Sequence, residues 1–180
     1  MRMKPENTMA IVIDYQEKLV PAMANKDELV KKSKMLLEGL GALGVPMIAT
    51  TQYAKGLGNT ITEISSVLGD TPIVDKSTFS VMASEDVSAA IVEGTKNIII
   101  CGMETHICVL QSMIDLQGAG YQTYVVADCV SSRSESDKAF ALVRAEQEGA
   151  KITTAEAILY ELLQGAKHPA FKTISALVKQ

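Results

Sequence analysis

Histidine, cysteine and aromatic side chains are scarce in this sequence. The 180 residues include two histidines, three cysteines and no tryptophan, and aromatic residues make up 4% of the chain. Two histidines are too few for a typical His-rich zinc centre, so we expect no metal ion. The odd number of cysteines and the absence of metal-like spacing favour free thiols in a reducing cytoplasm.

A large net charge and a long hydrophobic run are also missing. The formal net charge of −4 favours neither a nucleic-acid partner nor an anionic membrane surface. No apolar run approaches the roughly 20 residues that span a bilayer, and the opening MRMKPENTMAIVID reaches an acid too early for a signal peptide. The length predicts a single domain, residues 1–180, with one good core.

Short apolar, β-branched runs alternate with longer helical patterns along the whole chain. The expected strands are 9–13, 45–50, 71–75, 97–101, 122–127 and 150–154. Helical patterns cover 27–43, 84–94, 105–119, 134–148 and 155–164. This alternation predicts a three-layer α/β/α sandwich around a six-stranded parallel sheet whose strands are buried on both faces. The first strand is followed by DYQEK and not by a Gly-rich turn, which disfavours a dinucleotide, so we expect no cofactor.

Chemically useful side chains follow several of these strands, at the sheet edge where parallel α/β proteins bind ligands. Asp14 closes the first strand, where an acid is costly unless it is paired or functional. Lys76 follows the third strand, and Cys108 lies at the start of the helix after the fourth, where the helix dipole would lower its pKa. Each also has a structural interpretation: a helix cap or salt bridge, a solvated lysine, or a buried thiol. We expect Cys101 to be a core residue and Cys129 a packing thiol.

Together the first three residues would form a nucleophilic site. A cysteine nucleophile needs a base that takes its proton and later returns it to a leaving group, and Asp14 can do both. Lys76 would keep the carboxylate charged, and backbone amides between Glu104 and Cys108 could form an oxyanion hole. The alternative is a redox-sensing or binding module without turnover, in which Cys129 would be the resolving thiol for Cys108.

The residues resemble the isochorismatase-like cysteine hydrolases over nearly the whole chain. The resemblance rests on AIVIDYQEKLVPAM, TTQYAKGLG, DKSTFS, CGMETHICVLQSMIDLQGAGYQTYVVADCVSSRS and GAKITTAEAILYELL. It implies Asp14 as general acid and base, Lys76 as its partner and Cys108 as nucleophile. It also implies a cis peptide between Met103 and Glu104, which would aim the amide of His106, Ile107 or Cys108 at one oxygen.

The same resemblance shapes the expected activity. The nicotinamidase branch carries an Asp-x-His metal site where this chain has TTQYAKGLG, and isochorismate-cleaving members lack the cysteine. We therefore expect a cysteine hydrolase that cleaves a C–N bond of a small amide, urea or carbamoyl compound through a thioester. The resemblance further implies a homo-oligomer. Candidate substrate contacts, chosen by their place at strand ends, are Tyr15, Gln16, Gln52, Tyr53, Phe79, Thr105 and His106, of which His106 could equally be structural.

Overall fold

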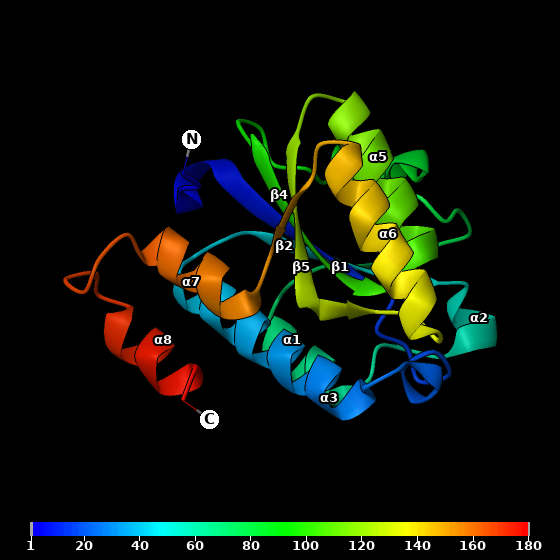
Figure 1. Cartoon of the computed structure of the whole chain (residues 1–180), viewed down its shortest axis with the longest axis horizontal. Coiled ribbons are helices and arrows are strands. Elements are labelled where there is room, and N and C mark those ends of the chain that lie inside the picture. The colour runs from blue at the N-terminus through cyan, green and yellow to red at the C-terminus, as the bar shows by residue number, and fades with distance from the viewer. Residues whose placement is uncertain (1, 180) are drawn as a thin grey trace.

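A computed structural model describes residues 2–179 and contains one six-stranded sheet (Figure 1). The strands are β1 (Thr8–Ile13), β2 (Met47–Gln52), β3 (Ile73–Lys76), β4 (Asn97–Met103), β5 (Gln122–Ser131) and β6 (Lys151–Thr153). All neighbouring pairs are parallel, and the order across the sheet is β3-β2-β1-β4-β5-β6. The predicted three-layer α/β/α sandwich is confirmed.

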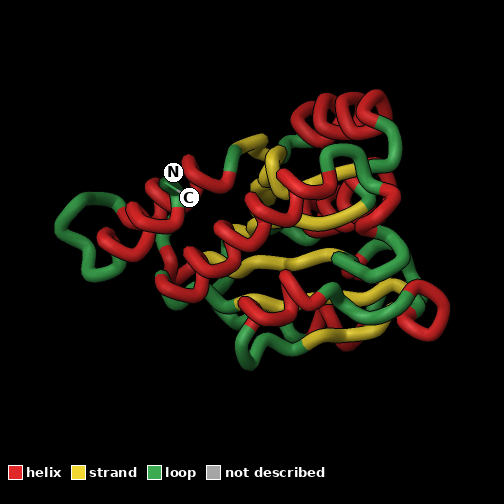
Figure 2. Tube along the Cα trace, turned by 90° about the horizontal axis from the view of Figure 1, so that it is seen from below, coloured by secondary structure: helices red, strands yellow, loops and turns green. Residues whose placement is uncertain are grey.

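Helices cover both faces of the sheet (Figure 1). One layer contains α1 (Lys26–Ala42), α3 (Thr62–Leu68), α7 (Ala155–Leu163) and α8 (Phe171–Leu177). The other contains α4 (Glu85–Ala89), α5 (Leu110–Gly118) and α6 (Glu135–Gln147). A short α2 (Ala54–Leu57) follows β2. Figure 2 shows the strands running side by side behind helices.

Several expected elements differ from the observed ones. The expected helix 105–119 begins as a π-helical turn, Thr105–Val109, before α5, and the expected helix 84–94 is reduced to α4. The sequence analysis missed α3 and α8. Burial on both faces holds for β1 and β4 but is wrong for the edge strands β3 and β6, each of which has two exposed residues.

Alternation along the central strands builds two hydrophobic cores. In β1, Ala10 and Val12 pack against the α1 layer, while Met9, Ile11 and Ile13 pack against the α5 layer. Burying each large aliphatic side chain contributes about 1.5–3 kcal/mol, so these opposed stripes determine which face of the strand meets which helices.

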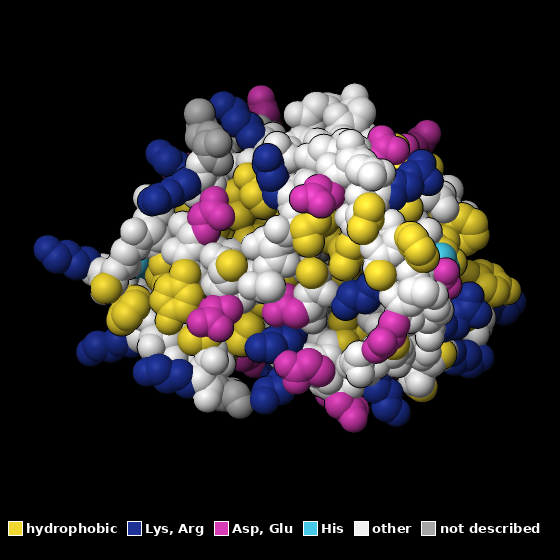
Figure 3. All heavy atoms as spheres, in the orientation of Figure 1, with side chains coloured by type: hydrophobic (Ala, Val, Ile, Leu, Met, Phe, Trp, Pro, Cys, Tyr) yellow, Lys and Arg dark blue, Asp and Glu magenta, His cyan; other side chains and the backbone are white. Residues whose placement is uncertain are grey.

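Charged side chains of both signs are interspersed over the face drawn in Figure 3. No single-sign field covers that face, in keeping with the formal net charge of −4. Within residues 2–179, none of the helices has the length and apolar character needed to cross a membrane.

The strands β1 and β4 lie side by side at the centre, and the chain leaves them toward opposite edges of the sheet. This arrangement opens a topological switch point at their carboxyl ends, where parallel α/β proteins place ligands. Gly102 lets the backbones of β1 and β4 come close together. Its φ is +128°, and a Cβ added there would lie 2.0 Å from the Ile13 carbonyl oxygen. Only glycine fits this position without moving β1.

We expect Gly102→Ala to destabilise the protein by about 3 kcal/mol, because strained φ and overpacking each cost about 1–3 kcal/mol. Gly44→Ala is the matched control, since Gly44 also has positive φ (+68°) but nothing lies within 4 Å of its added Cβ. The control should cost only about 1–2 kcal/mol. Thermal melts of both variants test this, at about 2–4 °C per kcal/mol for a chain of this size. Equal melting temperatures would contradict the steric argument.

Candidate active site

Asp14, Lys76 and Cys108 meet at the carboxyl edge of the sheet. Asp14 follows β1, Lys76 ends β3, and Cys108 lies in the π-helical turn after β4. Lys76 Nζ donates to Asp14 Oδ2 at 2.9 Å, and both side chains are fully buried. Cys108 is 6% exposed, and the charges of Asp14 and Lys76 both shift the pKa of its thiol. The three residues therefore form one cluster, as the sequence predicted.

The Lys76 ammonium has all three of its N–H donors engaged. Besides Asp14, it donates to Gln52 Oε1 at 2.7 Å and to the Thr78 carbonyl at 3.1 Å. A buried charge is tolerated only when it is paired and hydrogen-bonded, and this ammonium is both. All three N–H groups therefore bind protein acceptors, and none is left to donate a hydrogen bond to a ligand.

Asp14 is held on both carboxylate oxygens. Oδ1 accepts a 2.7 Å hydrogen bond from Thr50 Oγ1, and Oδ2 accepts from Lys76. The Asp14 backbone has φ +56°, a left-handed conformation that is uncommon outside glycine and that clusters at functional sites. Thr50 was missed in the sequence analysis. The signal was a hydroxyl at the end of the buried run VPMIAT, at the sheet edge where ligands are expected.

Burial raises the pKa of the Cys108 thiol to about 12, and the Asp14 charge, a hydrogen bond to Asp14 and the Glu104 charge act in the same direction. Lys76 opposes them. The expected lowering of this pKa is therefore wrong, because desolvation of a thiolate beside a carboxylate outweighs the partial charge of a helix end. Cys108 rests as a neutral thiol, so a base must remove its proton before it can attack. Burial also raises the pKa of Cys101 to about 12.

The turn between β4 and Cys108 contains a cis peptide bond between Met103 and Glu104, as the resemblance implies. The Glu104 side chain is buried and accepts from Arg133 at its backbone nitrogen (3.0 Å) and at Nε (3.2 Å). The expectation for Ile107 as an oxyanion donor is wrong, because its amide donates to the Glu104 carbonyl at 3.0 Å. The Thr105 and His106 amides have no such acceptor within residues 2–179.

His106 faces the end of β5 and the start of α6. Its Nδ1 lies 2.9 Å from Ser132 Oγ, and its Nε2 lies 4.0 Å from Asp137 Oδ2. The His106 side chain therefore links the π-helical turn to the end of β5 and to α6, which supports a structural role for this histidine. Ser112, which the sequence analysis missed, joins the turn on the other side: its hydroxyl donates to the Cys108 carbonyl and accepts from the Val81 amide.

The other predicted substrate contacts separate into buried and exposed groups. The prediction for Tyr15 is wrong: its hydroxyl lies in the α1-side core, 2.6 Å from both Ser33 Oγ and the Cys129 carbonyl. Gln16 is also fully buried and binds backbone groups. Tyr53 and Phe79, by contrast, are 57% and 53% exposed.

Thr105 is buried, and its hydroxyl has no hydrogen-bond partner among the described residues. Within residues 2–179, no group of three or more His, Cys, Asp or Glu side chains is placed to hold a metal ion.

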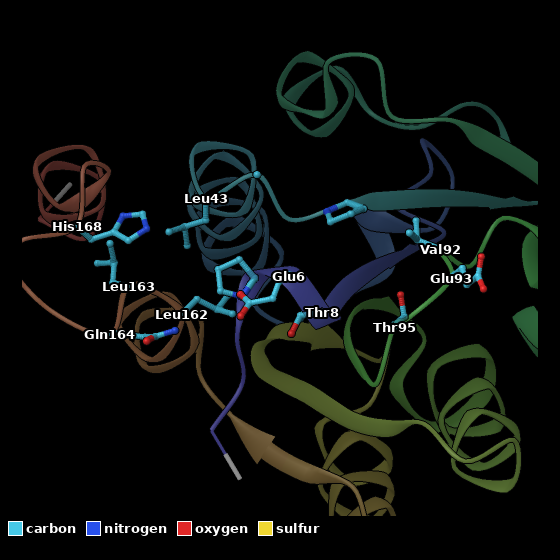
Figure 4. Close-up of a pocket in the computed structure, with 13 residues that line it drawn as sticks. Glu6, Thr8, Leu43, Val92, Glu93, Thr95, Leu162, Leu163, Gln164 and His168 are labelled. Carbon is cyan, nitrogen blue, oxygen red and sulfur yellow. The ribbon is translucent and has the colours of Figure 1, made fainter.

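A separate cavity of about 560 Å³ lies at the opposite, amino end of the strands (Figure 4). Thr8 at the start of β1, Leu43 after α1 and Thr95 before β4 contribute to its lining, and His168 approaches from the segment between α7 and α8. Its lining contains no cysteine and no buried ion pair. The candidate nucleophilic site is therefore the one at the carboxyl edge.

The fold and the site together define a parallel α/β sandwich with a buried Asp–Lys–Cys cluster at its switch point. Residues 8–157 match the family model of the isochorismatase domain, and the chain belongs to that family. It is 35% identical over 178 residues to isochorismatase domain-containing protein 1 of Danio rerio, covering 98% of this chain and 62% of that protein. The chain thus spans less than two thirds of that relative's length.

Other relatives match over more of their own length. The secreted isochorismatase effector Isc1 of Phytophthora sojae is 36% identical over 185 residues, covering 99% of this chain and 88% of the effector. A solved structure described as the MAR1 ribonuclease of Caenorhabditis elegans superposes with a TM-score of 0.95 at 38% identity. That superposition covers 100% of this chain and 93% of the other.

We expect Lys76→Met to destabilise the protein by about 3–5 kcal/mol, because it leaves the Asp14 carboxylate buried without its partner. The double variant Asp14→Asn/Lys76→Met should recover most of that loss, since no buried charge remains. Lys34→Met is the control, because it removes a solvent-exposed pair with Glu38 (3.9 Å) worth at most about 1 kcal/mol. Urea unfolding of the four proteins gives the comparison, and a double variant no more stable than Lys76→Met would contradict the buried-pair account.

We also expect alkylation of Cys108 by iodoacetamide to be slow at pH 7 and to accelerate through pH 10. A raised pKa leaves the thiol neutral below its ordinary value of about 8.5, and the thiolate forms only as pH rises toward the folded-state value of about 12. Site-resolved mass spectrometry separates this thiol from the fully buried Cys101 and Cys129. A rate plateau below pH 8 would show that the pKa is lowered instead.

Proposed function

We propose that this protein is a cysteine hydrolase that cleaves the C–N bond of a small amide, urea or carbamoyl compound through a thioester. The observation that carries the proposal is the fully buried Asp14–Lys76 ion pair acting on the thiol of Cys108. A structural ion pair alone would not require a thiol beside it. Membership of the isochorismatase family supports a hydrolytic role.

In the proposed reaction, Asp14 takes the proton of the Cys108 thiol while the sulfur attacks the substrate carbonyl carbon. The resulting oxyanion lies at the amides of Thr105 and His106, which are free to donate among the described residues. Asp14 then gives its proton to the leaving nitrogen as the C–N bond breaks, which leaves a thioester. A water molecule, deprotonated by Asp14, attacks this thioester and releases the acid and the thiol.

The surroundings of the thiol favour a small substrate. Cys108 is only 6% exposed, so a slender carbonyl group reaches the sulfur more easily than a bulky one. Tyr53 follows β2 and Phe79 follows β3, and both exposed aromatic rings are available to contact an apolar part of the substrate. We propose these two residues as the contacts that select among small amides.

The redox alternative requires Cys108 to reach a resolving thiol. Cys108 packs in the core on the α5 side of the sheet, whereas Cys101 and Cys129 pack in the core on the α1 side. The sheet therefore separates Cys108 from both other thiols, which favours hydrolysis over disulfide chemistry.

A second candidate activity is RNA cleavage, because the Caenorhabditis elegans relative that is 38% identical is described as a ribonuclease. The mixed charges on the face drawn in Figure 3 and the net charge of −4 offer little attraction for a phosphate backbone. An RNA substrate nevertheless belongs in the activity test, since it separates the two candidates directly.

We also propose that the protein is a homo-oligomer. Phe140 and Val143 are one turn apart on α6 and are 76% and 53% exposed, which is unusual for large apolar side chains on one helix face. A structural neighbour at 21% identity, YcaC of Escherichia coli, is described as an octameric hydrolase. Light scattering of the purified chain tests the proposal, and a monomer at all concentrations would contradict it.

We expect wild-type protein to release ammonia or an amine from at least one member of a panel of small amides, ureas and carbamoyl compounds. Cys108→Ala should lower the rate at least about 10³-fold, since it removes the nucleophile. Cys101→Ala is the matched control, because it removes a thiol from the other face of the sheet and should retain activity. Cleavage of a labelled single-stranded RNA with no amide turnover would replace this proposal with the nuclease. Equal activity in wild type and Cys108→Ala would remove the thiol from the mechanism.

A further inference from the structure

Gln52 occupies the strand between the two halves of the buried ion pair. It ends β2, which lies between β1 and β3 in the sheet, and these neighbours carry Asp14 and Lys76 at their ends. Gln52 Oε1 accepts from Lys76 Nζ at 2.7 Å, and Gln52 Nε2 donates to the Ser77 carbonyl at 3.0 Å. Both polar atoms of this amide therefore bind the segment that carries the lysine.

The backbone of Gln52 is clamped as firmly as its side chain. Its amide nitrogen donates to Gln16 Oε1 at 2.7 Å, and its carbonyl accepts from Gln16 Nε2 at 3.1 Å. The same Gln16 nitrogen also donates to the Gly58 carbonyl at 2.8 Å, and Gln16 is fully buried. Gln16, two residues after Asp14, thus fixes the backbone at the end of β2, and the Gln52 side chain at that end binds the Lys76 ammonium.

This arrangement limits where the Lys76 ammonium can go. Lysine has a flexible four-carbon stem, so one carboxylate partner alone does not fix its position. The Gln52 and Thr78 oxygens supply the second and third acceptors, and together they direct the third N–H at Asp14. Loss of the Gln52 oxygen would leave one buried N–H without a partner and would free the ammonium to move.

We propose that Gln52 is a positioning residue, which holds the Lys76 ammonium against Asp14 so that the carboxylate can take the Cys108 proton. This inference rests on the proposed function. It replaces the expected role of Gln52 as a substrate contact, because its oxygen and nitrogen are already bound within the protein.

The effect should be visible at the thiol without any substrate. The charged groups that act on Cys108 are Asp14, Lys76 and Glu104, and only Lys76 favours the thiolate. If the ammonium moves away, the pKa of Cys108 rises further and alkylation slows at a given pH. One pKa unit changes the thiolate fraction about tenfold.

The experiment compares two substitutions at this position. Gln52→Met keeps the length of the side chain and removes the amide. Gln52→Glu keeps an acceptor oxygen but adds a carboxylate that competes with Asp14 for the lysine. Gln122→Met is the matched control, since Gln122 is also a half-buried glutamine that donates to a backbone carbonyl (Gly149, 3.1 Å), but it begins β5 at the opposite, amino end of the strands. The rate of Cys108 alkylation is measured from pH 7 to pH 10, alongside thermal melts.

Both Gln52 variants should alkylate about threefold to tenfold more slowly than wild type across this range, while Gln122→Met alkylates at the wild-type rate. With an active substrate, kcat should fall and KM should stay constant. Wild-type alkylation in both Gln52 variants, whatever their melting temperatures, would overturn the inference, as would a raised KM with unchanged kcat. Because alkylation needs no turnover, slowed alkylation in the Gln52 variants combined with full activity of Cys108→Ala would remove the thiol from the proposed mechanism and leave the positioning of Lys76 by Gln52 standing.

Discussion

The buried ion pair between Asp14 and Lys76 is the interaction on which the arrangement of the site depends. Its two side chains have no contact with solvent, so their lost hydration must be replaced by protein groups. Thr50, Gln52 and the Thr78 carbonyl supply those groups. The segments after β1, β2 and β3 therefore have to end in one place and in one conformation, which orders this edge of the sheet before any ligand binds.

The topology of the sheet explains why a thiol can join this pair. The central strands β1 and β4 lead away toward opposite edges, and the turn after β4 brings Cys108 over the end of β1. Gly102 permits the close approach of the two strands, and Glu104 is tied to Arg133 at the end of β5. Cys108 is thus supported by three strands, while the two other thiols lie on the far side of the sheet.

Much of the fold and part of the site could be predicted from the sequence. The apolar runs of β1 and β4 mark buried strands, and an acid, a lysine and a cysteine placed after strands indicate a common edge. Tyr15 was misassigned because the left-handed backbone of Asp14 alters the direction of the chain and the next side chain enters the core. Ile107 was misassigned because the acceptor of its amide depends on how the π-helical turn closes.

The sequence by itself determined the α/β class and the parallel sheet, since these follow from hydrophobic periodicity, and it placed Asp14, Lys76 and Cys108 as candidates at one edge of the sheet. Only the tertiary structure decided the protonation of Cys108 and the partners of Lys76. A pKa depends on desolvation and on neighbouring charges, and here those neighbours are distant in the chain: Lys76 and Asp14 are 62 residues apart. The local sequence predicts a helix start at Cys108, whose dipole would lower the pKa of the thiol. The burial that raises this pKa instead exists only after the strands assemble.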